Sequence, residues 1–341
     1  YPSINLLIIL FGLFLCFKRF EIIKLPLLIL FTFLVTIQFI GHNVNEDFGY
    51  YHLPYVINFI SDKLILGLSN LSMVQGYNSA WLNISAFFYL PYFSEKTVHF
   101  ANSIISLSII IFYVTYLKEK KIYKFSISSL YALLAISFFL IKNSRLNSFG
   151  VDVAGHIYAS LVFFLLINFF ENKKLYFRKS LFYLIVVFTI FSIFIKLSYI
   201  PLIVIPLICI YIEKKVFDKK IIYLSLLIGF PWILQQVAYT SCFIFPLDFT
   251  CIKFLPWYSR DFINDAAFSL EYINKSYWVY KGTLTPVEYI KDFNWVHTWF
   301  FRNLVELVEN ILTFLAPLIF LIIIKINKNL RPKKLKDNEL I

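Results

Sequence analysis

Residues 152–170 read DVAGHIYASLVFFLLINFF, and the carboxyl of Asp152 and the imidazole of His156 both stand near the start of this stretch. A helix needs about 20 mostly apolar residues to cross the hydrocarbon core of a bilayer. The stretch therefore predicts a membrane-spanning helix with two polar side chains at one of its ends.

The rest of the chain has the same character. Of its 341 residues, 60% are hydrophobic and 15% are charged, and the mean hydropathy is +0.73. A soluble protein needs a polar surface and carries roughly 25% charged residues. The composition therefore predicts an all-α, polytopic membrane helical bundle that forms one integral membrane domain over residues 1–341.

Apolar runs between charged clusters predict about nine membrane-spanning helices. We expect them at about 4–17, 25–40, 99–117, 125–141, 152–170, 180–195, 199–213, 220–239 and 303–325. They leave two segments, about 41–98 and 240–302, that are too long to be simple connectors. We expect the short turns at 142–151 and 196–198 to lie near these long segments in space.

Basic residues gather on one side of this arrangement. When the nine spans alternate, the same side receives the clusters at 18–24, 118–124, 173–179 and 214–220 and the tail at 326–341. Lysine and arginine favour the cytoplasmic side of a membrane. The pattern predicts a cytoplasmic C-terminus and external long segments. The net charge of +12 is then a topology signal, and nucleic acid is not an expected partner.

The four cysteines fall into two groups. Cys16 and Cys209 lie in apolar runs and are expected to be packing residues. Cys242 and Cys251 lie nine residues apart in the second external segment. An oxidising compartment would allow a disulfide between them, and the sequence leaves the disulfide and two free thiols equally open.

The first external segment begins GHNVNEDFGYYHLP at 41–54. Residues 50–62 are expected to form a short helix. The apolar and aromatic segment 77–93 cannot span without reversing the later lysine clusters, so we expect it to lie in the membrane interface, where Trp and Tyr are favoured.

An acidic residue just after an early span, followed by tyrosine-rich helices on the membrane, resembles the GT-C glycosyltransferases, which use polyprenyl-phosphate-linked sugars. Residues 46–54, EDFGYYHLP, carry this resemblance. The same string and CFIFPLDFTCIKFLPW at 242–257 also resemble uncharacterised bacterial membrane proteins of surface-polysaccharide type. These likenesses imply a bacterial inner membrane and an active site that faces the periplasm.

The resemblance implies that Asp47 is the catalytic carboxylate, with Glu46 beside it. It also implies that Tyr51 and His52 contact the substrate. A carboxylate can act as general base on an acceptor hydroxyl, and cations stabilise the charge that grows on a leaving phosphate. The alternative is that Glu46 and Asp47 are solvated charges at a helix boundary. Many GT-C enzymes need a divalent cation, so this family also allows one here.

Two basic residues near the membrane are candidates for binding phosphate. Lys196 lies in the turn between the spans expected at 180–195 and 199–213, and Arg145 lies in the turn before Asp152. Ionisable residues at the rim of a span are functional candidates. The alternative for Lys196 is that its amine snorkels to the interface.

Asp152 and His156 are four residues apart and share one helix face. Such a pair could support the site, relay protons or hold a cation. The alternative for Asp152 is that it only complements the positive helix N-terminus. Two visible ligands do not predict a metal site.

These observations favour a membrane glycosyltransferase that moves a sugar from a lipid-linked donor to a glycan, lipid or protein acceptor on the non-cytoplasmic face. A transporter or flippase of a lipid-linked saccharide is the alternative from a different class. A polysaccharide polymerase or ligase and a non-catalytic scaffold also remain open.

Overall fold

The computed structural model describes residues 47–61, 64–90, 95–119, 126–143, 150–305 and 307–308. Within these ranges the chain forms helices and no strand, and an isolated antiparallel bridge joins Cys242 to Cys251. The all-α prediction is therefore confirmed for the described residues. The spans expected at 4–17 and 25–40 and most of the span expected at 303–325 lie outside them.

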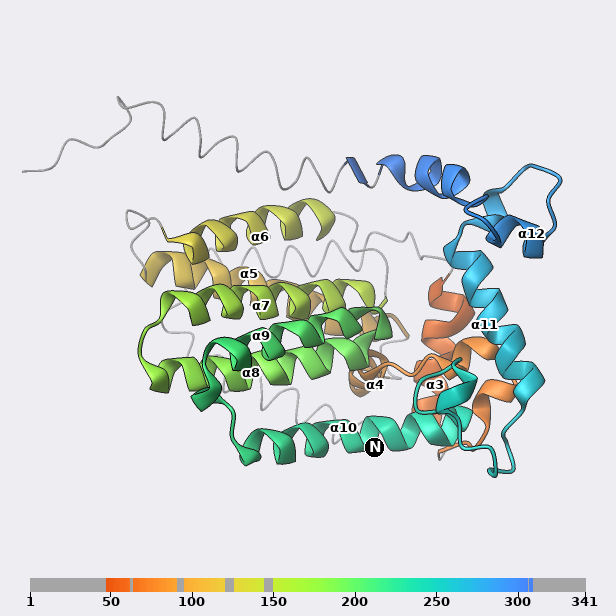
Figure 1. The fold of residues 1–341 in the computed structure, drawn as a ribbon, viewed down its shortest axis with the longest axis horizontal. Helices are drawn as coiled ribbons and strands as arrows, with labels where there is room; N and C mark the ends of the chain where they lie inside the picture. The colour runs from red at the N-terminus through yellow and green to blue at the C-terminus, as the bar shows by residue number, and fades with distance from the viewer. Residues whose placement is uncertain are drawn as a thin grey trace, which may run out of the picture.

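In the described part of the chain, six helices form an antiparallel bundle (Figure 1). They are α5 (Phe100–Glu119), α6 (Ile127–Asn143), α7 (Asp152–Glu171), α8 (Leu175–Ile195), α9 (Val204–Ile212) and α10 (Lys219–Thr240). Each corresponds to one of the spans expected between residues 99 and 239. Four helices of the described part are long and apolar enough to cross a membrane, and they are Thr97–Glu119, α7, α8 and α10.

The span expected at 199–213 is not one regular α-helix. It begins as the 3-10 helix η7 (Leu197–Ile203), and α9 follows directly. Pro201 lies inside η7, and a proline has no N–H to donate to an α-helical hydrogen bond. The helix expected at about 199–213 is present as Leu197–Ile212, and its first part has 3-10 geometry.

Two apolar clusters fill the bundle. One joins α5, α6 and α7 around the buried rings of Tyr113 and Phe164. The other joins α7, α8, α9 and α10 around Phe169 and Phe182. Helix α7 contributes to both clusters, so it lies at the centre of the described bundle.

The two ends of the bundle differ in what joins the helices (Figure 1). At one end, short turns that carry lysines link α7 to α8 and α9 to α10, and the second turn includes η8 (Lys214–Val216). We call it the basic end. At the opposite end lie the described residues 47–61, 64–90 and 95–99, the turns at 150–151 and 196–198, and residues 241–305. Together they form the loop end.

The first external segment is built from short helices. These are η2 (Phe48–His52), α3 (Leu53–Ser61), η3 (Leu68–Asn70), η4 (Met73–Gly76), α4 (Ala80–Phe87) and η6 (Glu95–His99). The helix expected over 50–62 is confirmed by η2 and α3. Of the segment expected at 77–93, the structure describes residues 77–90, which are helical over α4. Ser79 fixes the start of this helix by accepting a hydrogen bond from the Trp81 amide.

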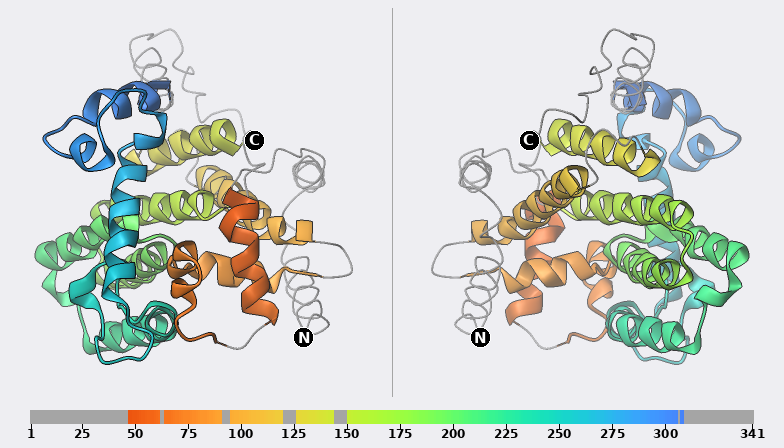
Figure 2. Two further views of the ribbon diagram at one scale, coloured as in Figure 1. Left: turned by 90° about the vertical axis from the view of Figure 1, so that its right-hand side faces the viewer. Right: turned by 90° about the vertical axis from the view of Figure 1, so that its left-hand side faces the viewer.

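The segment after α10 also folds across the loop end. It holds η9 (Asp248–Thr250), α11 (Arg260–Asn274), η10 (Tyr277–Val279) and α12 (Pro286–Ile290). Figure 2 looks onto this end in its left view, where α11 crosses the ends of the bundle helices. Cys242 and Cys251 form a disulfide with an S–S distance of 2.01 Å, so the bonded alternative is the one observed.

Candidate active site at the loop end

The candidate site lies where the first external segment meets the ends of α7 and α8. The Ser79 hydroxyl donates to the carbonyl of Ile195, the last residue of α8, at 2.8 Å. The Asn102 side chain of α5 donates to the Gly150 carbonyl at 3.1 Å and accepts from the Trp81 indole N–H at 2.5 Å. These bonds hold the first segment beside the start of α7 and the end of α8, as expected for the two short turns.

A second polar network joins the first segment to α10. The Tyr55 hydroxyl donates to Asn78 Oδ1 at 2.7 Å, and burial raises the pKa of this phenol well above its usual range. The Asn83 amide donates to Gln235 at 2.8 Å, and the Gln235 amide donates to the Tyr55 hydroxyl at 3.2 Å. All four groups are neutral at physiological pH, so this attachment does not depend on ion pairs.

Asp152 and Lys196 form an ion pair, with Lys196 Nζ 2.6 Å from Asp152 Oδ1. Asp152 is the first residue of α7, where the helix dipole favours a carboxylate. Lys196 is the extended residue that ends α8. Their side chains are 63% and 46% exposed, and ion pairs as exposed as this one contribute about 0–1 kcal/mol to stability. Its main effect is to hold the amine at a defined place on the surface.

Tyr51 lies close to two carboxylates that come from different elements. Burial raises the pKa of its phenol most, and the negative charges of Asp47 and Asp152 raise it further. Asp47 precedes Tyr51 by one helical turn, whereas Asp152 belongs to α7. The phenol therefore stays protonated at physiological pH and can donate a hydrogen bond between the two acidic positions.

His52 is buried, and its ring lies against the turn that leads into α7. A Cβ atom added to Gly150 would lie 3.2 Å from His52 Cε1, which is tighter than an ordinary contact. Gly150 therefore lets the backbone just before Asp152 approach the imidazole. His52 is positioned to support this turn rather than to face solvent.

His156 and Tyr199 lie on the outer side of the same site. His156 is exposed one turn after Asp152, and its ring centroid is 6.3 Å from that of Tyr199. A Cβ atom at Gly155 would lie 2.4 Å from the Tyr199 ring, so this glycine lets the ring pack onto α7. The shared face of Asp152 and His156 is confirmed, and the carboxylate makes its ion pair with Lys196.

Four buried polar atoms, where the first external segment meets α10, have no hydrogen-bond partner among the described residues. They are Gln75 Oε1, the Tyr77 hydroxyl, Trp232 Nε1 and Gln236 Oε1. Tyr77 also acts electrostatically on Tyr51, and burial raises the pKa of Tyr77 itself to about 12. Buried donors and acceptors are nearly always paired, by water or ligand if not by protein. Water or the hydroxyl groups of a ligand can complete the hydrogen bonds of these four groups.

Two of the predicted site residues, Glu46 and Arg145, lie outside the described residues. The structure brings Asp47, Tyr51, Asp152 and Lys196 together. His52 lies against Gly150, just before Asp152, and His156 lies beside Tyr199. Our sequence analysis missed Tyr77, Gln75 and Gln236. Their signal was the presence of amide and phenol side chains at the ends of otherwise apolar segments, where such groups are costly unless they are bonded.

Carboxylates and histidines at this site do not gather as a metal centre within the described ranges, where no group of three or more such ligands occurs. Asp47 and Asp152 approach Tyr51 from different elements. Within the described chain, these two residues are the ones that a cation beside Tyr51 would meet first.

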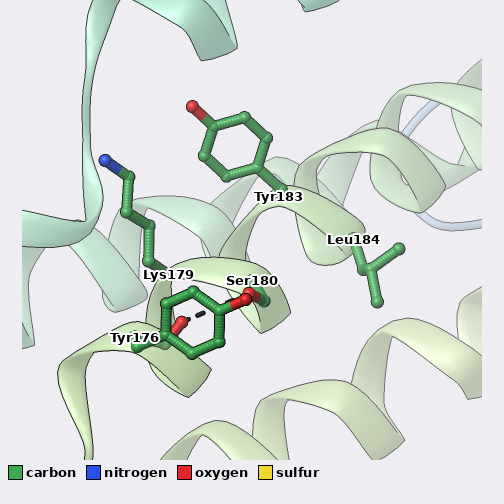
Figure 3. A pocket seen from close by; sticks show the side chains of 5 residues that line it. All are labelled: Tyr176, Lys179, Ser180, Tyr183 and Leu184. Atoms are coloured by element: carbon green, nitrogen blue, oxygen red, sulfur yellow. Dashed lines mark hydrogen bonds between the residues drawn. The ribbon is translucent and has the colours of Figure 1, made fainter.

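A pocket of about 480 Å³ lies far from this site, on the basic half of α8 (Figure 3). Lys179 and Tyr183 extend from the helix in the same general direction. The amine lies 2.6 Å from Asp218 Oδ2, and the Tyr183 hydroxyl donates to Asp218 Oδ1 at 2.5 Å. Asp218 caps α10, so these contacts tie α8 to α10 at the basic end.

The family model of a domain of unknown function, DUF8201, matches residues 4–337 of the chain. No curated protein and no solved structure matches this chain.

Proposed function

We propose that this chain, which belongs to the DUF8201 family, is a membrane glycosyltransferase. The description of the family assigns no activity, so the proposal rests on the residues of the loop end. The enzyme would transfer a sugar from a polyprenyl-phosphate carrier to an acceptor hydroxyl. The observation that supports this most concerns the Tyr51 phenol. The charges of Asp47 and Asp152 both raise its pKa, and Asp152 forms an ion pair with Lys196. An acid–base group and a cation thus occur beside one donor of hydrogen bonds.

Asp47 is assigned as the general base. Its side chain is on an exposed residue at the start of η2, so an acceptor can reach it. The carboxylate removes the proton from the acceptor hydroxyl, and the oxygen attacks the anomeric carbon of the donor sugar. The bond from this carbon to the phosphate oxygen breaks, and its electron pair stays on the phosphate. Glu46, the neighbouring carboxylate, is the second candidate for this role.

Lys196 is assigned to the leaving phosphate. A phosphate gains negative charge as its bond to the sugar breaks, and a fixed cation nearby stabilises that charge. In the absence of donor the amine is held by Asp152, and an arriving phosphate competes for the same amine. Arg145, in the turn before α7, is proposed as a second cation for this phosphate. We assign no step to a metal ion.

The sugar ring is expected to lie over Tyr51 and Tyr77. A sugar presents several hydroxyls that both donate and accept, which matches the donors and acceptors left without protein partners on Gln75, Tyr77, Trp232 and Gln236. His52 and His156 are assigned supporting positions on either side. This complementarity favours a saccharide over a purely apolar substrate.

In the proposed membrane arrangement, about nine helices span a bacterial inner membrane. The lysine-rich turns and the C-terminus face the cytoplasm, and the loop end faces the periplasm. A carrier lipid would then approach from the outer leaflet. The acceptor is a glycan, lipid or protein on that side.

The test is sugar transfer in proteoliposomes that contain a mixed pool of polyprenyl-phosphate sugars. The wild type is expected to transfer sugar, and Lys196→Ala is expected to lower the transfer rate about 100-fold, the cost of removing a donor that stabilises a developing anion. Asp265→Asn is the matched control, because Asp265 is an exposed carboxylate of α11 outside the site. It should keep the wild-type rate.

Movement of the intact lipid-linked sugar between leaflets is measured in the same vesicles. Such movement without transfer to any acceptor would favour the transporter or flippase and contradict the enzyme. An unchanged transfer rate in Lys196→Ala would remove this amine from the phosphate site. Sugar transfer that falls in Lys196→Ala and stays at the wild-type rate in Asp265→Asn would support the enzyme.

A further inference from the structure

An apolar groove runs between α8, α9 and α10, away from the site proposed for sugar transfer. Its volume is about 300 Å³. The lining includes Phe182, Val186, Ile203, Ile210, Ile222 and Leu226. On α8 it extends from Phe182 to Ile190, which is about 12 Å at the 1.5 Å rise of a helix.

Two hydroxyls interrupt this lining. The Ser225 hydroxyl donates to the Ile221 carbonyl of its own helix at 2.8 Å. The Thr189 hydroxyl has no hydrogen-bond partner among the described residues, and rotation about its Cα–Cβ bond would let it donate to the carbonyl one turn earlier in α8, so it does not require a polar ligand. The groove is therefore suited to a hydrocarbon chain.

One end of the groove, which we call its mouth, lies at the basic end, because Phe217 of the turn between α9 and α10 lines it. In the sequence Phe217 lies between two lysine pairs, 214–215 and 219–220. Lys219 precedes the groove residue Ile222 by three positions and therefore lies on the same face of α10. None of these four lysines forms an ion pair with another described residue.

The nearby cations on α8 are already neutralised. Arg178 lies 3.7 Å from Glu213, and Lys179 lies 2.6 Å from Asp218. The larger pocket on α8 (Figure 3) has Lys179 as its cation, and Asp218 already occupies that amine. A negative ligand would therefore meet more unbalanced positive charge at the mouth of the groove than in this pocket.

We propose that the groove between α8, α9 and α10 binds one acyl chain of an anionic phospholipid, with Lys215 and Lys219 at its phosphate. Two of its walls, α8 and α10, are long and apolar enough to lie within a bilayer. The outer residues Ile222 and Leu226 are exposed, so a neighbouring lipid can enter from the side. Charge complementarity at the mouth favours an anionic head group over a zwitterionic one.

The test is native mass spectrometry of the purified protein with phosphatidylglycerol or phosphatidylcholine that carry the same acyl chains. Phosphatidylglycerol is expected to be retained at least fivefold more than phosphatidylcholine. In the double variant Lys215→Gln/Lys219→Gln, its binding should fall roughly 5-fold for each lysine removed. Lys173→Gln/Lys174→Gln is the matched control at the other turn of the basic end, and its binding should change less than twofold.

A second variant tests the apolar part of the site. Ser225→Phe should fill the groove and abolish the retention of phosphatidylglycerol. Leu227→Phe, on an exposed residue of α10 that does not line the groove, should leave it intact. Equal binding of the two lipids, equal effects of the two lysine pairs, or full retention in Ser225→Phe would each overturn the proposal. None of these measurements depends on sugar transfer.

Discussion

The two ends of the helix bundle differ in the contacts that join their segments. At the basic end, the ion pair of Lys179 with Asp218 ties α8 to α10, and an exposed ion pair also joins Asp152 to Lys196 at the loop end. The first external segment is attached at the loop end by neutral hydrogen bonds, such as those of Ser79 with Ile195 and Asn102 with Gly150.

This difference predicts where substitutions are costly. Exposed ion pairs contribute about 0–1 kcal/mol, because water solvates both partners when they separate. A buried donor or acceptor that loses its partner costs about 1–3 kcal/mol. Single changes at the loop end should therefore lower stability more than comparable changes at the basic end.

The largest effect is expected for Asn102→Ala. This change leaves the Trp81 indole N–H and the Gly150 carbonyl without their partner. With about 1–3 kcal/mol for each of the two orphaned groups, the free energy of unfolding should fall by about 2–6 kcal/mol. The measurement is unfolding of the protein in mixed micelles by increasing SDS.

The basic-end control for this change is Lys179→Gln. Lys179 Nζ lies 2.6 Å from Asp218 Oδ2, and the two side chains are 43% and 26% exposed. The expected loss is about 1 kcal/mol or less, because water solvates both partners when they separate. If Lys179→Gln destabilises the protein as much as Asn102→Ala does, the contrast between the two ends is wrong.

The next effect concerns the disulfide of the loop end. Cys242→Ser/Cys251→Ser opens a loop with a sequence separation of 9, and the chain-entropy model gives a loss of about 2.5 kcal/mol for a loop of this size. Limited proteolysis should then cut the protein faster between residues 242 and 258. An unchanged cleavage rate there would show that other contacts hold this loop.

Two helix glycines allow a comparison of steric packing at and away from the loop end. Gly155→Ala, at the loop end, would place a Cβ atom 2.4 Å from the Tyr199 ring, whereas Gly229→Ala would place one 3.3 Å from Phe194. Both variants gain the same helix propensity, so their difference isolates the steric clash. Gly155→Ala should be less stable than Gly229→Ala by about 1–3 kcal/mol, measured by thermal unfolding. Equal stabilities would contradict the close packing of Tyr199 on α7.

The smallest effect should come from the pH dependence of Asp218. Its hydrogen bond from Lys179, and then that from Tyr183, lower the pKa of this carboxyl from 3.8 to about 2. A lowered pKa in the folded state means that the stabilisation is present above pH 3.8 and disappears as the pH falls through about 2. The stability difference between wild type and Asp218→Asn should therefore shrink over this range and be constant above it. A difference that instead changes between pH 6 and 8 would exclude this origin.

Much of the bundle could be predicted from the sequence. The length and apolar character of the runs predict helices α5 to α10, because a spanning segment must satisfy its own backbone hydrogen bonds. The irregular start at Leu197–Ile203 was missed, although Pro201 is a local signal for it. The sequence left two alternatives for Cys242 and Cys251, a disulfide or two free thiols, because their spacing does not determine their redox state.

Less of the candidate site could be predicted from the sequence. Asp47, Tyr51, Asp152 and Lys196 were singled out by their place at the rims of apolar segments. The ion pair between Asp152 and Lys196 was not predicted, because it depends on how α7 packs against α8. The roles of Gly150 and Gly155 were also missed, since a single sequence does not reveal which ring will approach a glycine.

The central claim is that the carboxylate of Asp47 removes the proton from the acceptor during sugar transfer. The most direct measurement is the single-turnover rate of transfer in proteoliposomes for Asp47→Asn beside Asp265→Asn, with folding of both variants checked by thermal unfolding. General-base catalysis contributes about 10²–10⁴-fold. We expect Asp47→Asn to lose at least 100-fold in rate while Asp265→Asn stays within twofold of wild type, and equal rates in the two folded variants would contradict the assignment of Asp47.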